Sequence, residues 1–380
     1  MTLDSSPSIT AQRFTALDIF RGCTICFMII VNTTGNGATT YWPLLHADWN
    51  GFTPTDLVFP SFLFAVGNAL SFTMKSWEAM TQSRVLYKIV KRTFLIFLVG
   101  YLMYWFPFFK IDAQSNFILS PVSHTRIMGV LQRIALCYGI VALMVYYLGT
   151  KKTLWLGVLS LIAYWVLLLV FGEHGAELTK TGNAVLRLDT WLFGIDHLYG
   201  GEGFPFDPEG VLSTLPAIFN VIGGYAVGRY LQHKGKSYDG LFKLLFAGIV
   251  LLLLAYCWDP FFPVNKKLWT SSYALLTVGL DCIILAGIVY ITDILGKKKG
   301  TQFFLITGKN PLIIYLVSEL GVTMLWLMKI GDQPLHVWLY QHLFIFAGDY
   351  LGAFLFSVWW MMMCWLVGYA MDRNKIYIRL

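Results

Sequence analysis

Long apolar runs are the feature that most constrains what this chain can fold into. A helix needs about 20 predominantly apolar residues to cross a bilayer. Ten segments approach that length: Leu17–Thr34, Asp56–Met74, Ile89–Trp105, Gly129–Leu148, Leu154–Phe171, Leu212–Leu231, Leu241–Trp258, Ser272–Ile294, Pro311–Met328 and Tyr350–Met371. The runs are unbroken rather than alternating, which argues against a transmembrane β-barrel. The sequence therefore predicts an all-α, polytopic transmembrane helical bundle.

The stretch Leu335–Phe346 is apolar but shorter than a span. It is either a re-entrant or interfacial helix or an additional span, which gives a prediction of about 10–11 spans. Charged residues make up only 13% of the chain, whereas soluble domains carry about 25%. We expect residues 1–380 to form a single transmembrane domain, with the long segment 172–210 as an extracytoplasmic loop within it.

The distribution of basic residues predicts the orientation in the membrane. If the N-terminus is cytoplasmic, most of the 28 Lys and Arg residues fall in inner loops, as the positive-inside rule requires. Both termini are then cytoplasmic, and the loops 35–55, 172–210 and 259–269 lie on the outer side. The net charge of +7 is explained by this bias, so we do not expect nucleic-acid binding.

The six cysteines and seven histidines give no convincing metal site. Cys23 and Cys26 have CxxC spacing but lie within the first apolar segment, where membrane packing is the better interpretation. His336 and His342 are six positions apart, so one helix would not present both to one ion. We therefore expect no metal. The polar start of the chain shows no cleavable signal, so we expect the first helix to serve as the insertion signal.

One polar patch lies between the first two apolar segments. It contains His46, and a histidine near the bilayer is the side chain best suited to move a proton at neutral pH. Asn32 ends the first segment, and Asp56 opens the second as a candidate N-cap. A carboxylate beside His46 would fix its tautomer, and an asparagine would orient a carbonyl or an amine. We therefore predict His46, Asn32 and Asp56 as catalytic residues; a surface histidine with a capping aspartate is the alternative.

A second set of residues is a candidate for binding a sugar. Asp207 and Glu209 precede the sixth apolar segment, where they could bind hydroxyls or an ammonium, or simply interact with the helix dipole. The segment Pro263–Trp269 has the aromatic and amide character of sugar sites, although interfacial lysines often only snorkel. The predicted substrate-binding residues are Asp207, Glu209, Asn265, Lys266, Trp49 and Asn50.

A third set is basic or amide-bearing and lies within or at the ends of the apolar segments. Cations near helix N-termini could hold an anionic ligand such as phosphate. For Arg21 the alternative is an ion pair with Asp18, three positions earlier on the same helix face. The predicted cofactor-binding residues are Arg21, Gln132, Arg133, Lys309 and Asn310.

Taken together, these motifs resemble the transmembrane catalytic domain of the heparan-α-glucosaminide N-acetyltransferase family and its bacterial, NagX-like relatives. Each motif alone is weak, but their order along nearly the whole chain is specific. The motifs are Leu17–Gly22, His46–Gly51, Asp56–Pro60, Gly129–Arg133, Asp207–Leu212, Pro263–Trp269, Gly308–Pro311 and Met371–Lys375.

The resemblance implies transfer of an acetyl group from acetyl-CoA across the membrane to the amine of a glucosamine unit. His46 matches the family's active-site histidine, and Asn32 matches its partner asparagine. The family mechanism is framed either through an acetyl-histidine intermediate or as direct transfer with the histidine as base, and we favour direct transfer. Unlike the lysosomal members, this sequence shows no N-terminal luminal domain. We therefore expect a bacterial inner-membrane protein whose acceptor is a free or oligomeric amino sugar.

Other functions remain open at this point. Intramembrane polar groups also suit an amino-sugar or oligosaccharide transporter, although no inverted repeat is visible. A glycan O-acetyltransferase and a binding partner in a peptidoglycan-handling complex are further alternatives. The expected partners are the amino-sugar acceptor and the lipid bilayer, and a homodimer is compatible with the sequence.

Overall fold

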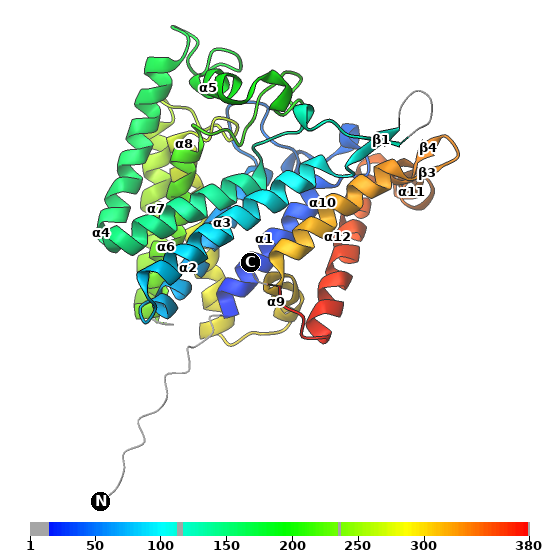
Figure 1. Cartoon of the computed structure of the whole chain (residues 1–380). Coiled ribbons are helices and arrows are strands. Elements are labelled where there is room, and N and C mark those ends of the chain that lie inside the picture. The colour runs from blue at the N-terminus through cyan, green and yellow to red at the C-terminus, as the bar shows by residue number, and fades with distance from the viewer. Residues whose placement is uncertain (1–14, 112–116, 235–236, 379–380) are drawn as a thin grey trace, which may run out of the picture.

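The computed structural model describes residues 15–111, 117–234 and 237–378 of the chain. Twelve α-helices lie in this part: α1 (Thr15–Asn32), α2 (Val58–Trp77), α3 (Gln82–Trp105), α4 (Val130–Phe171), α5 (Ala184–Phe193), α6 (Thr214–Lys234), α7 (Tyr238–Trp258), α8 (Ser271–Val289), α9 (Thr301–Lys309), α10 (Pro311–Leu327), α11 (Leu335–Leu343) and α12 (Asp349–Arg373). The expected all-α, polytopic architecture is confirmed (Figure 1). The start of the chain, whose cytoplasmic location the sequence predicts, lies outside the described residues.

Each of the ten expected apolar segments falls on a helix, but the elements are divided differently. Six helical stretches in the described residues are long and apolar enough to cross a membrane, or seven if α9 and α10, bent by 84°, count as one broken span. Helix α4 is 42 residues long and contains two of the expected segments. Its arms are joined at Gly149, which has φ 71°, a conformation that glycine adopts at low cost. The short stretch after residue 334 forms α11, of nine residues, which is too short to span.

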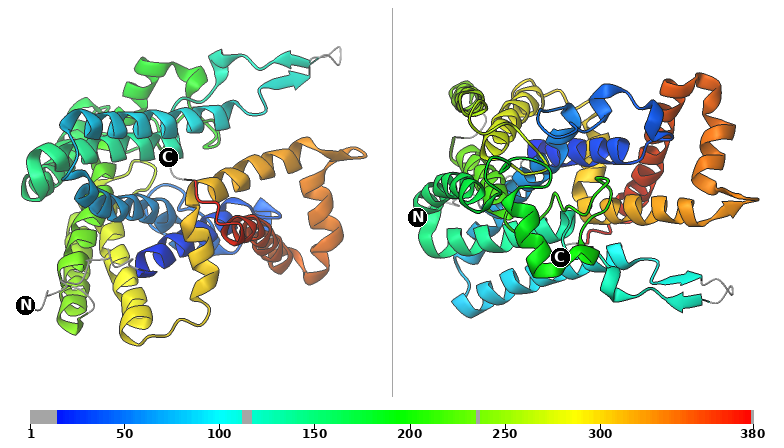
Figure 2. Two further views of the ribbon diagram at one scale, coloured as in Figure 1. Left: turned by 60° about the horizontal axis from the view of Figure 1, so that its bottom comes forward. Right: turned by 90° about the horizontal axis from the view of Figure 1, so that it is seen from above.

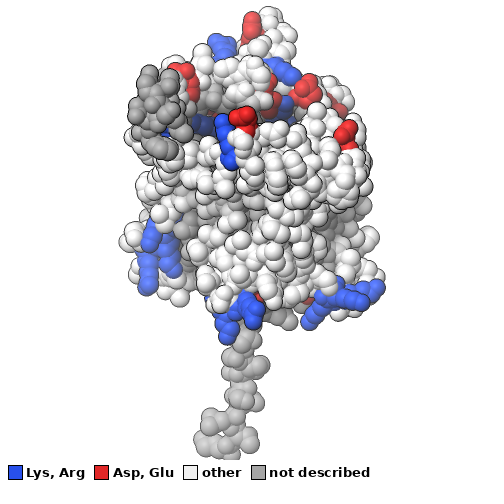
Figure 3. Space-filling view, turned by 90° about the vertical axis from the view of Figure 1, so that its right-hand side faces the viewer, with Lys and Arg blue, Asp and Glu red and all other residues white. Residues whose placement is uncertain are grey.

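Two small antiparallel hairpins extend the bundle. Strand β1 (Phe109–Ile111) pairs with β2 (Phe117–Leu119), and β3 (Lys329–Ile330) pairs with β4 (Gln333–Pro334). Both hairpins project from the same side of the molecule (Figure 2). Charge is also unevenly distributed: on the face shown in Figure 3, Lys and Arg lie around the lower end, whereas Asp and Glu gather, together with further Lys and Arg, around a hollow at the upper end. The orientation in the membrane stays a prediction from the positive-inside rule.

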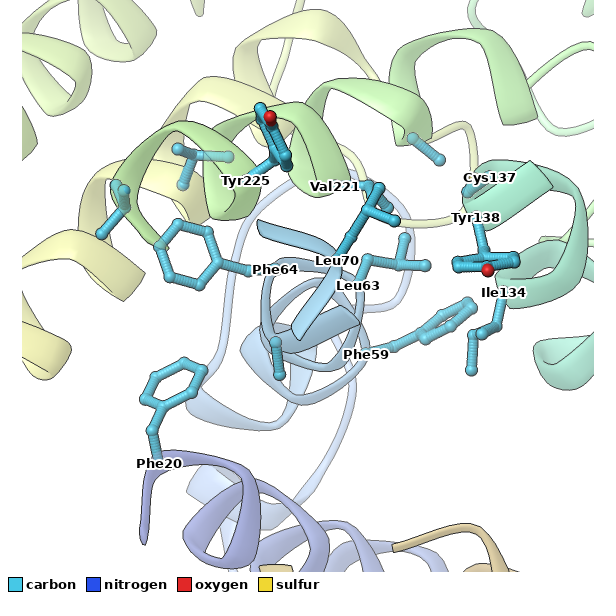
Figure 4. Packing of buried hydrophobic residues seen from close by; sticks show 14 of the residues in the cluster. Phe20, Phe59, Leu63, Phe64, Leu70, Ile134, Cys137, Tyr138, Val221 and Tyr225 are labelled. Atoms are coloured by element: carbon cyan, nitrogen blue, oxygen red, sulfur yellow. The ribbon is translucent and has the colours of Figure 1, made fainter. Parts of the chain in front are cut away.

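The core is built around α2, which packs closely against α6. Phe59, Leu63 and Phe64 of α2 face Val221 and Tyr225 of α6 and the side chains of α4 (Figure 4). Glycines allow the two backbones to approach, as small residues do in many membrane helix pairs. A Cβ at Gly67 would lie 1.9 Å from the Val221 carbonyl oxygen, and one at Gly224 would lie 1.9 Å from that of Phe64. The contact between α2 and α6 therefore requires glycine at both positions.

This packing predicts the effect of a single methyl group. Gly67→Ala should destabilise the fold by at least about 1–3 kcal/mol, because the clash is with backbone rather than with a flexible side chain. The measurement is thermal unfolding in detergent, monitored by circular dichroism at 222 nm, roughly the helical minimum. Gly37→Ala is the matched control, since an added Cβ there meets no described atom within 4 Å. Equal unfolding temperatures for the two variants would contradict the packing argument.

Candidate active site

A cavity of about 1060 Å³ runs through the bundle between α1, α2, α3, α4 and α10. Its wall includes Asp18 in the first turn of α1 and Asn32 at the last position of that helix. Fourteen helical steps of 1.5 Å separate these residues, so the cavity extends for roughly 20 Å along α1. A passage of this length covers most of a hydrocarbon core about 30 Å thick.

His46 lies at the end of the cavity that the predicted orientation places outside (the outer end), and it is held by Asp56. The opposite end, beside Asp18, is the inner end. Its Nδ1 is 2.7 Å from Asp56 Oδ1, and the Asp56 side chain is only 1% exposed. The other carboxylate oxygen accepts hydrogen bonds from the backbone N–H groups of Ala47 (3.2 Å) and Thr53 (3.0 Å) and from the Thr53 hydroxyl (3.1 Å). Because the carboxylate accepts, Nδ1 carries the proton, and the lone pair of His46 is on Nε2.

The structure corrects one detail of the expected hairpin. The sequence suggests Asp56 as the N-cap of the second helix, but α2 begins at Val58 and Asp56 is the third residue of a 3-10 helix, Pro54–Leu57. Thr53 is the cap, and it forms a capping box with Asp56. The carboxylate therefore reaches back over the turn, which is what places it beside His46.

Lys266 approaches His46 from the opposite loop. Its Nζ lies 3.2 Å from Nε2 and 3.0 Å from Nδ1; since the Nδ1 proton already binds Asp56, only Nε2 can accept a hydrogen bond from the ammonium group. Burial and the Lys266 charge lower the pKa of His46, against the opposing effect of the Asp56 carboxylate. Burial also lowers the pKa of Lys266, with Asp56 and Glu209 opposing it. His46 is therefore poised as a neutral base at physiological pH.

Asn50 and Asn265 connect the loops that carry His46 and Lys266. The Asn265 amide donates to Asn50 Oδ1 at 3.0 Å, and the Gly51 N–H donates to the Val264 carbonyl at 2.8 Å. Asn265 Oδ1 also accepts from the Leu268 N–H at 2.8 Å, which fixes the turn that presents Lys266. Both asparagines lie outside the cavity wall, so their geometry indicates positioning rather than direct substrate contact.

Trp49 is also placed in the scaffold rather than in the cavity. Its indole N–H donates to the Leu178 carbonyl at 2.8 Å, and its ring packs edge-to-face on Phe206 at 5.6 Å. This contact joins the His46 loop to the long outer loop.

Arg126 organises the acidic pair of the outer loop. It donates to Asp207 through Nε (2.9 Å) and Nη2 (2.7 Å), and Nη2 also lies 2.6 Å from a Glu209 oxygen. The rings of Tyr104 and Tyr199 lie 4.8 Å and 4.5 Å from the guanidinium carbon. Glu209 and Arg126 line the cavity, whereas Asp207 lies behind them. The sequence did not single out Arg126, because its partners are 81 and 83 residues away.

The predicted cofactor residues separate into two groups. Arg21 and Lys309 line the inner end of the cavity. Arg21 forms the expected ion pair with Asp18 at 3.6 Å and donates to the Gly308 carbonyl at 3.2 Å. Lys309 lies 2.6 Å from Asp372. Both side chains lie beside the cavity, and their binding of a cofactor phosphate stays a prediction.

Gln132, Arg133 and Asn310 lie outside the cavity wall. Arg133 is fully buried, donates to Gly210 and Ser213, and sits over the Trp269 ring. The Asn310 amide is occupied by the backbone of residues 376 and 378. The contacts of Arg133 and Asn310 fit structural roles, because neither residue lines the cavity. Arg133 Nε and Nη1 and the Gln132 side-chain amide have no hydrogen-bond partner among the described residues.

Two cavity residues that the sequence did not single out are Arg92 and Glu319. Each other lining carboxylate has a basic partner: Asp18 has Arg21, Glu202 has Lys267, and Glu209 has Arg126. Within the described ranges, Glu319 forms no ion pair; it accepts a hydrogen bond from Asn32 Nδ2 at 3.3 Å. Arg92 lies over Tyr138 at 4.7 Å, and its Nε has no hydrogen-bond partner among the described residues. Membrane charges without partners mark ligand sites by default.

The described residues contain no group of three or more His, Cys, Asp and Glu side chains that could hold a metal ion. All six cysteines are free thiols. The side chains that line the cavity offer acid–base chemistry from His46 and Lys266 and electrostatic binding from the charged residues named above.

Comparison with known proteins assigns the family. Residues 13–239 match the family model described as heparan-alpha-glucosaminide N-acetyltransferase, catalytic. The mouse heparan-alpha-glucosaminide N-acetyltransferase is 28% identical over 385 residues, covering 86% of this chain and 56% of the mouse protein. The human protein of the same name is 28% identical over 367 residues, covering 82% and 53%. The chain thus spans about half the length of these relatives. It belongs to the catalytic-domain family of the heparan-alpha-glucosaminide N-acetyltransferases.

Proposed function

We propose that this protein transfers an acetyl group from cytoplasmic acetyl-CoA to the amine of a glucosamine-type sugar on the extracytoplasmic side of the membrane. The observation that carries the proposal is the cavity that extends along α1 and holds the His46–Asp56 pair at its outer end. Membership of an N-acetyltransferase family supports the reaction type. The expected location is a bacterial inner membrane, with the outer loops in the periplasm.

The inner end of the cavity fits a phosphorylated donor. Arg21, Arg92 and Lys309 line this end, and the unpartnered Arg92 Nε is an orphaned donor that a phosphate oxygen would satisfy. Acetyl-CoA carries phosphates at one end and the thioester at the other. With its phosphates at the inner end of the cavity and its thioester toward the outer end, acetyl-CoA would supply an activated acetyl group near His46. The protein would bind the phosphates and shield the reacting carbonyl from bulk water.

His46 and Asn32 are suited to the acyl-transfer step. The sugar amine must be neutral to attack the thioester carbonyl, and the resulting tetrahedral centre loses a proton from nitrogen as the C–S bond breaks. His46 Nε2 accepts that proton and then donates it to the departing thiolate. Asn32 gives one amide hydrogen to Glu319, and its second can stabilise the oxyanion. Direct transfer uses every group in this arrangement without a covalent intermediate on the protein.

Glu319 is the best candidate for recognising the acceptor amine. An amino sugar arrives largely as an ammonium ion, and Glu319 is the lining carboxylate that has no basic partner among the described residues. Tyr315 lies one helical turn earlier and also lines the cavity. A carboxylate with an aromatic neighbour suits a cationic sugar, and it disfavours a sugar that carries only hydroxyls.

His46→Ala tests the proposed reaction. Wild-type protein in detergent should release CoA from acetyl-CoA when glucosamine is added, and the variant should be slower by about 10²–10⁴-fold because the general base is gone. The measurement is thiol release across a panel of amino sugars, with a hydroxyl-only sugar as the negative control. Equal rates for wild type and variant would exclude the assignment of His46. Sugar flux into proteoliposomes without CoA release would favour a transporter.

The Lys266 charge predicts a pH effect on His46. Burial and the Lys266 charge lower the pKa of His46 from its ordinary value in the wild type, so the neutral form prevails above this lowered pKa and is lost as the pH falls through it. Lys266→Met removes a nearby positive charge and should raise the pH midpoint of the His46 titration. Lys266→Arg keeps the charge and should leave that midpoint low. The readout is the pH dependence of His46 modification by diethyl pyrocarbonate, which attacks neutral imidazole, followed by peptide mass spectrometry. An unchanged midpoint in Lys266→Met would contradict the electrostatic argument.

Glu319→Gln tests the ammonium site. The amide keeps an acceptor for Asn32 but removes the charge, so KM for glucosamine should rise by about 10- to 100-fold, as expected for a charge-assisted hydrogen bond. KM for acetyl-CoA should not change. Asp48→Asn is the matched control, because the Asp48 side chain is 90% exposed and lies outside the cavity. If both variants keep the wild-type KM for glucosamine, Glu319 does not bind the amine.

A further inference from the structure

Lys266 presents a primary amine at the point where the acceptor amine must react. Its Nζ is 3.2 Å from His46 Nε2, the atom that carries the lone pair, and 3.0 Å from Nδ1. Lys266 and His46 both line the cavity. A sugar amine awaiting deprotonation would need to approach the same imidazole, so the lysine amine lies within reach of the base that the acceptor would use.

The surroundings of Lys266 also favour a reactive amine. Its side chain is 17% exposed and is 3.8 Å from Asp56 Oδ1. The titratable groups that act on it are Asp56, Glu209, Glu202 and Lys267, with His46 at hydrogen-bond distance. Burial lowers the pKa of Lys266, which increases the neutral, nucleophilic fraction at a given pH.

The adjacent lysine is held differently. Lys267 forms an ion pair with Glu202, and its side chain is 14% exposed, about as buried as Lys266. The two lysines are adjacent in one loop and about equally buried, but of the two only Lys266 contacts His46. This contrast provides an internal control within one peptide.

We propose that Lys266 is an acceptor in cis: when acetyl-CoA is bound and no amino sugar is present, the protein acetylates the Nζ of Lys266. The inference rests on the proposed acetyl-transfer function. The bond between Nζ and the acetyl carbon forms and the thioester C–S bond breaks. Starting from the lysine ammonium, one proton goes to the thiolate through His46 Nε2 and one is released to solvent. The products are an Nε-acetyllysine and CoA.

Acetylation of Lys266 has two consequences at the site. The amide is stable, so the reaction is a dead end rather than a step in transfer, and the acetyl group lies where a sugar amine would approach His46. The positive charge next to His46 is also lost. Protein that carries acetyl at Lys266 should therefore turn over glucosamine more slowly, and saturating glucosamine should protect it from the modification.

The experiment is peptide mass spectrometry of detergent-purified protein incubated with acetyl-CoA alone. Acetylation should accumulate at Lys266 at least about tenfold faster than at Lys267, and His46→Ala should slow it about 100-fold, in line with loss of a general base. Added glucosamine should suppress it. Because acetyllysine survives hydroxylamine and acetylimidazole does not, a hydroxylamine wash separates this product from an acetylated His46.

The outcomes distinguish this inference from the proposed function. If wild-type protein acetylates glucosamine but Lys266 stays unmodified without the sugar, the inference is wrong and the function stands. Equal acetylation of Lys266 and Lys267, or acetylation of Lys266 that persists in His46→Ala, would mean uncatalysed chemistry and would also overturn the inference. If no amino sugar gives CoA release, the proposed function fails, and acetylation of Lys266 is then judged by its dependence on His46 alone.

Discussion

The Asp56 carboxylate is the interaction on which the outer site depends. It is almost completely buried, and it accepts hydrogen bonds from His46, Ala47 and both the backbone and the hydroxyl of Thr53. These donors compensate the cost of removing a carboxylate from water. The same bonds close the turn that starts α2 and set the tautomer of His46. The Asp56 carboxylate thus serves both the local fold and the base, His46. Moving it away from His46 would also break the hydrogen bonds of the turn that precedes α2.

Pairing of charges explains the rest of the cavity. A charged side chain within the membrane is costly unless it has a partner, and most of those in the wall have one: Arg126 with Glu209, Lys267 with Glu202, and Lys309 with Asp372. These pairs leave the wall polar but nearly neutral. The charged side chains of the wall without an ion-pair partner among the described residues are Arg92, toward the inner end, and Glu319, farther out. We expect these two charges to determine which ligands the cavity prefers.

The sequence predicts the helices and the centre of the site better than it predicts the wall. Apolar length locates the long helices, although six or seven helical stretches among the described residues are long and apolar enough to cross a membrane, against the ten predicted. The polar patch locates His46 and Asp56. Both signals are local. Arg126 and Glu319 form their contacts across 81 and 287 residues, and no local spacing reveals such pairs. Arg133 shows the same limit: a cation near a helix start resembles a phosphate site, and its burial against Gly210 and Ser213, across 77 and 80 residues, is not visible in any local spacing. The break at Gly149, in contrast, falls in the gap between two predicted segments, which end at Leu148 and begin at Leu154.

Under the proposed function, the positions of Arg92 and Glu319 would determine which end of the cavity each ligand occupies. Arg92 lies 12 residues before Tyr104 on α3, or roughly 18 Å along the helix, and Tyr104 contacts the Arg126 cluster at the outer end. Under the proposed function, the polyanionic donor would be attracted to Arg92 toward the inner end and the cationic acceptor to Glu319 farther out, and each would be disfavoured beside the other's charge. The neutral arm that joins the phosphates of acetyl-CoA to the thioester would cross the region between the two charges without an electrostatic penalty and bring the acetyl group toward His46.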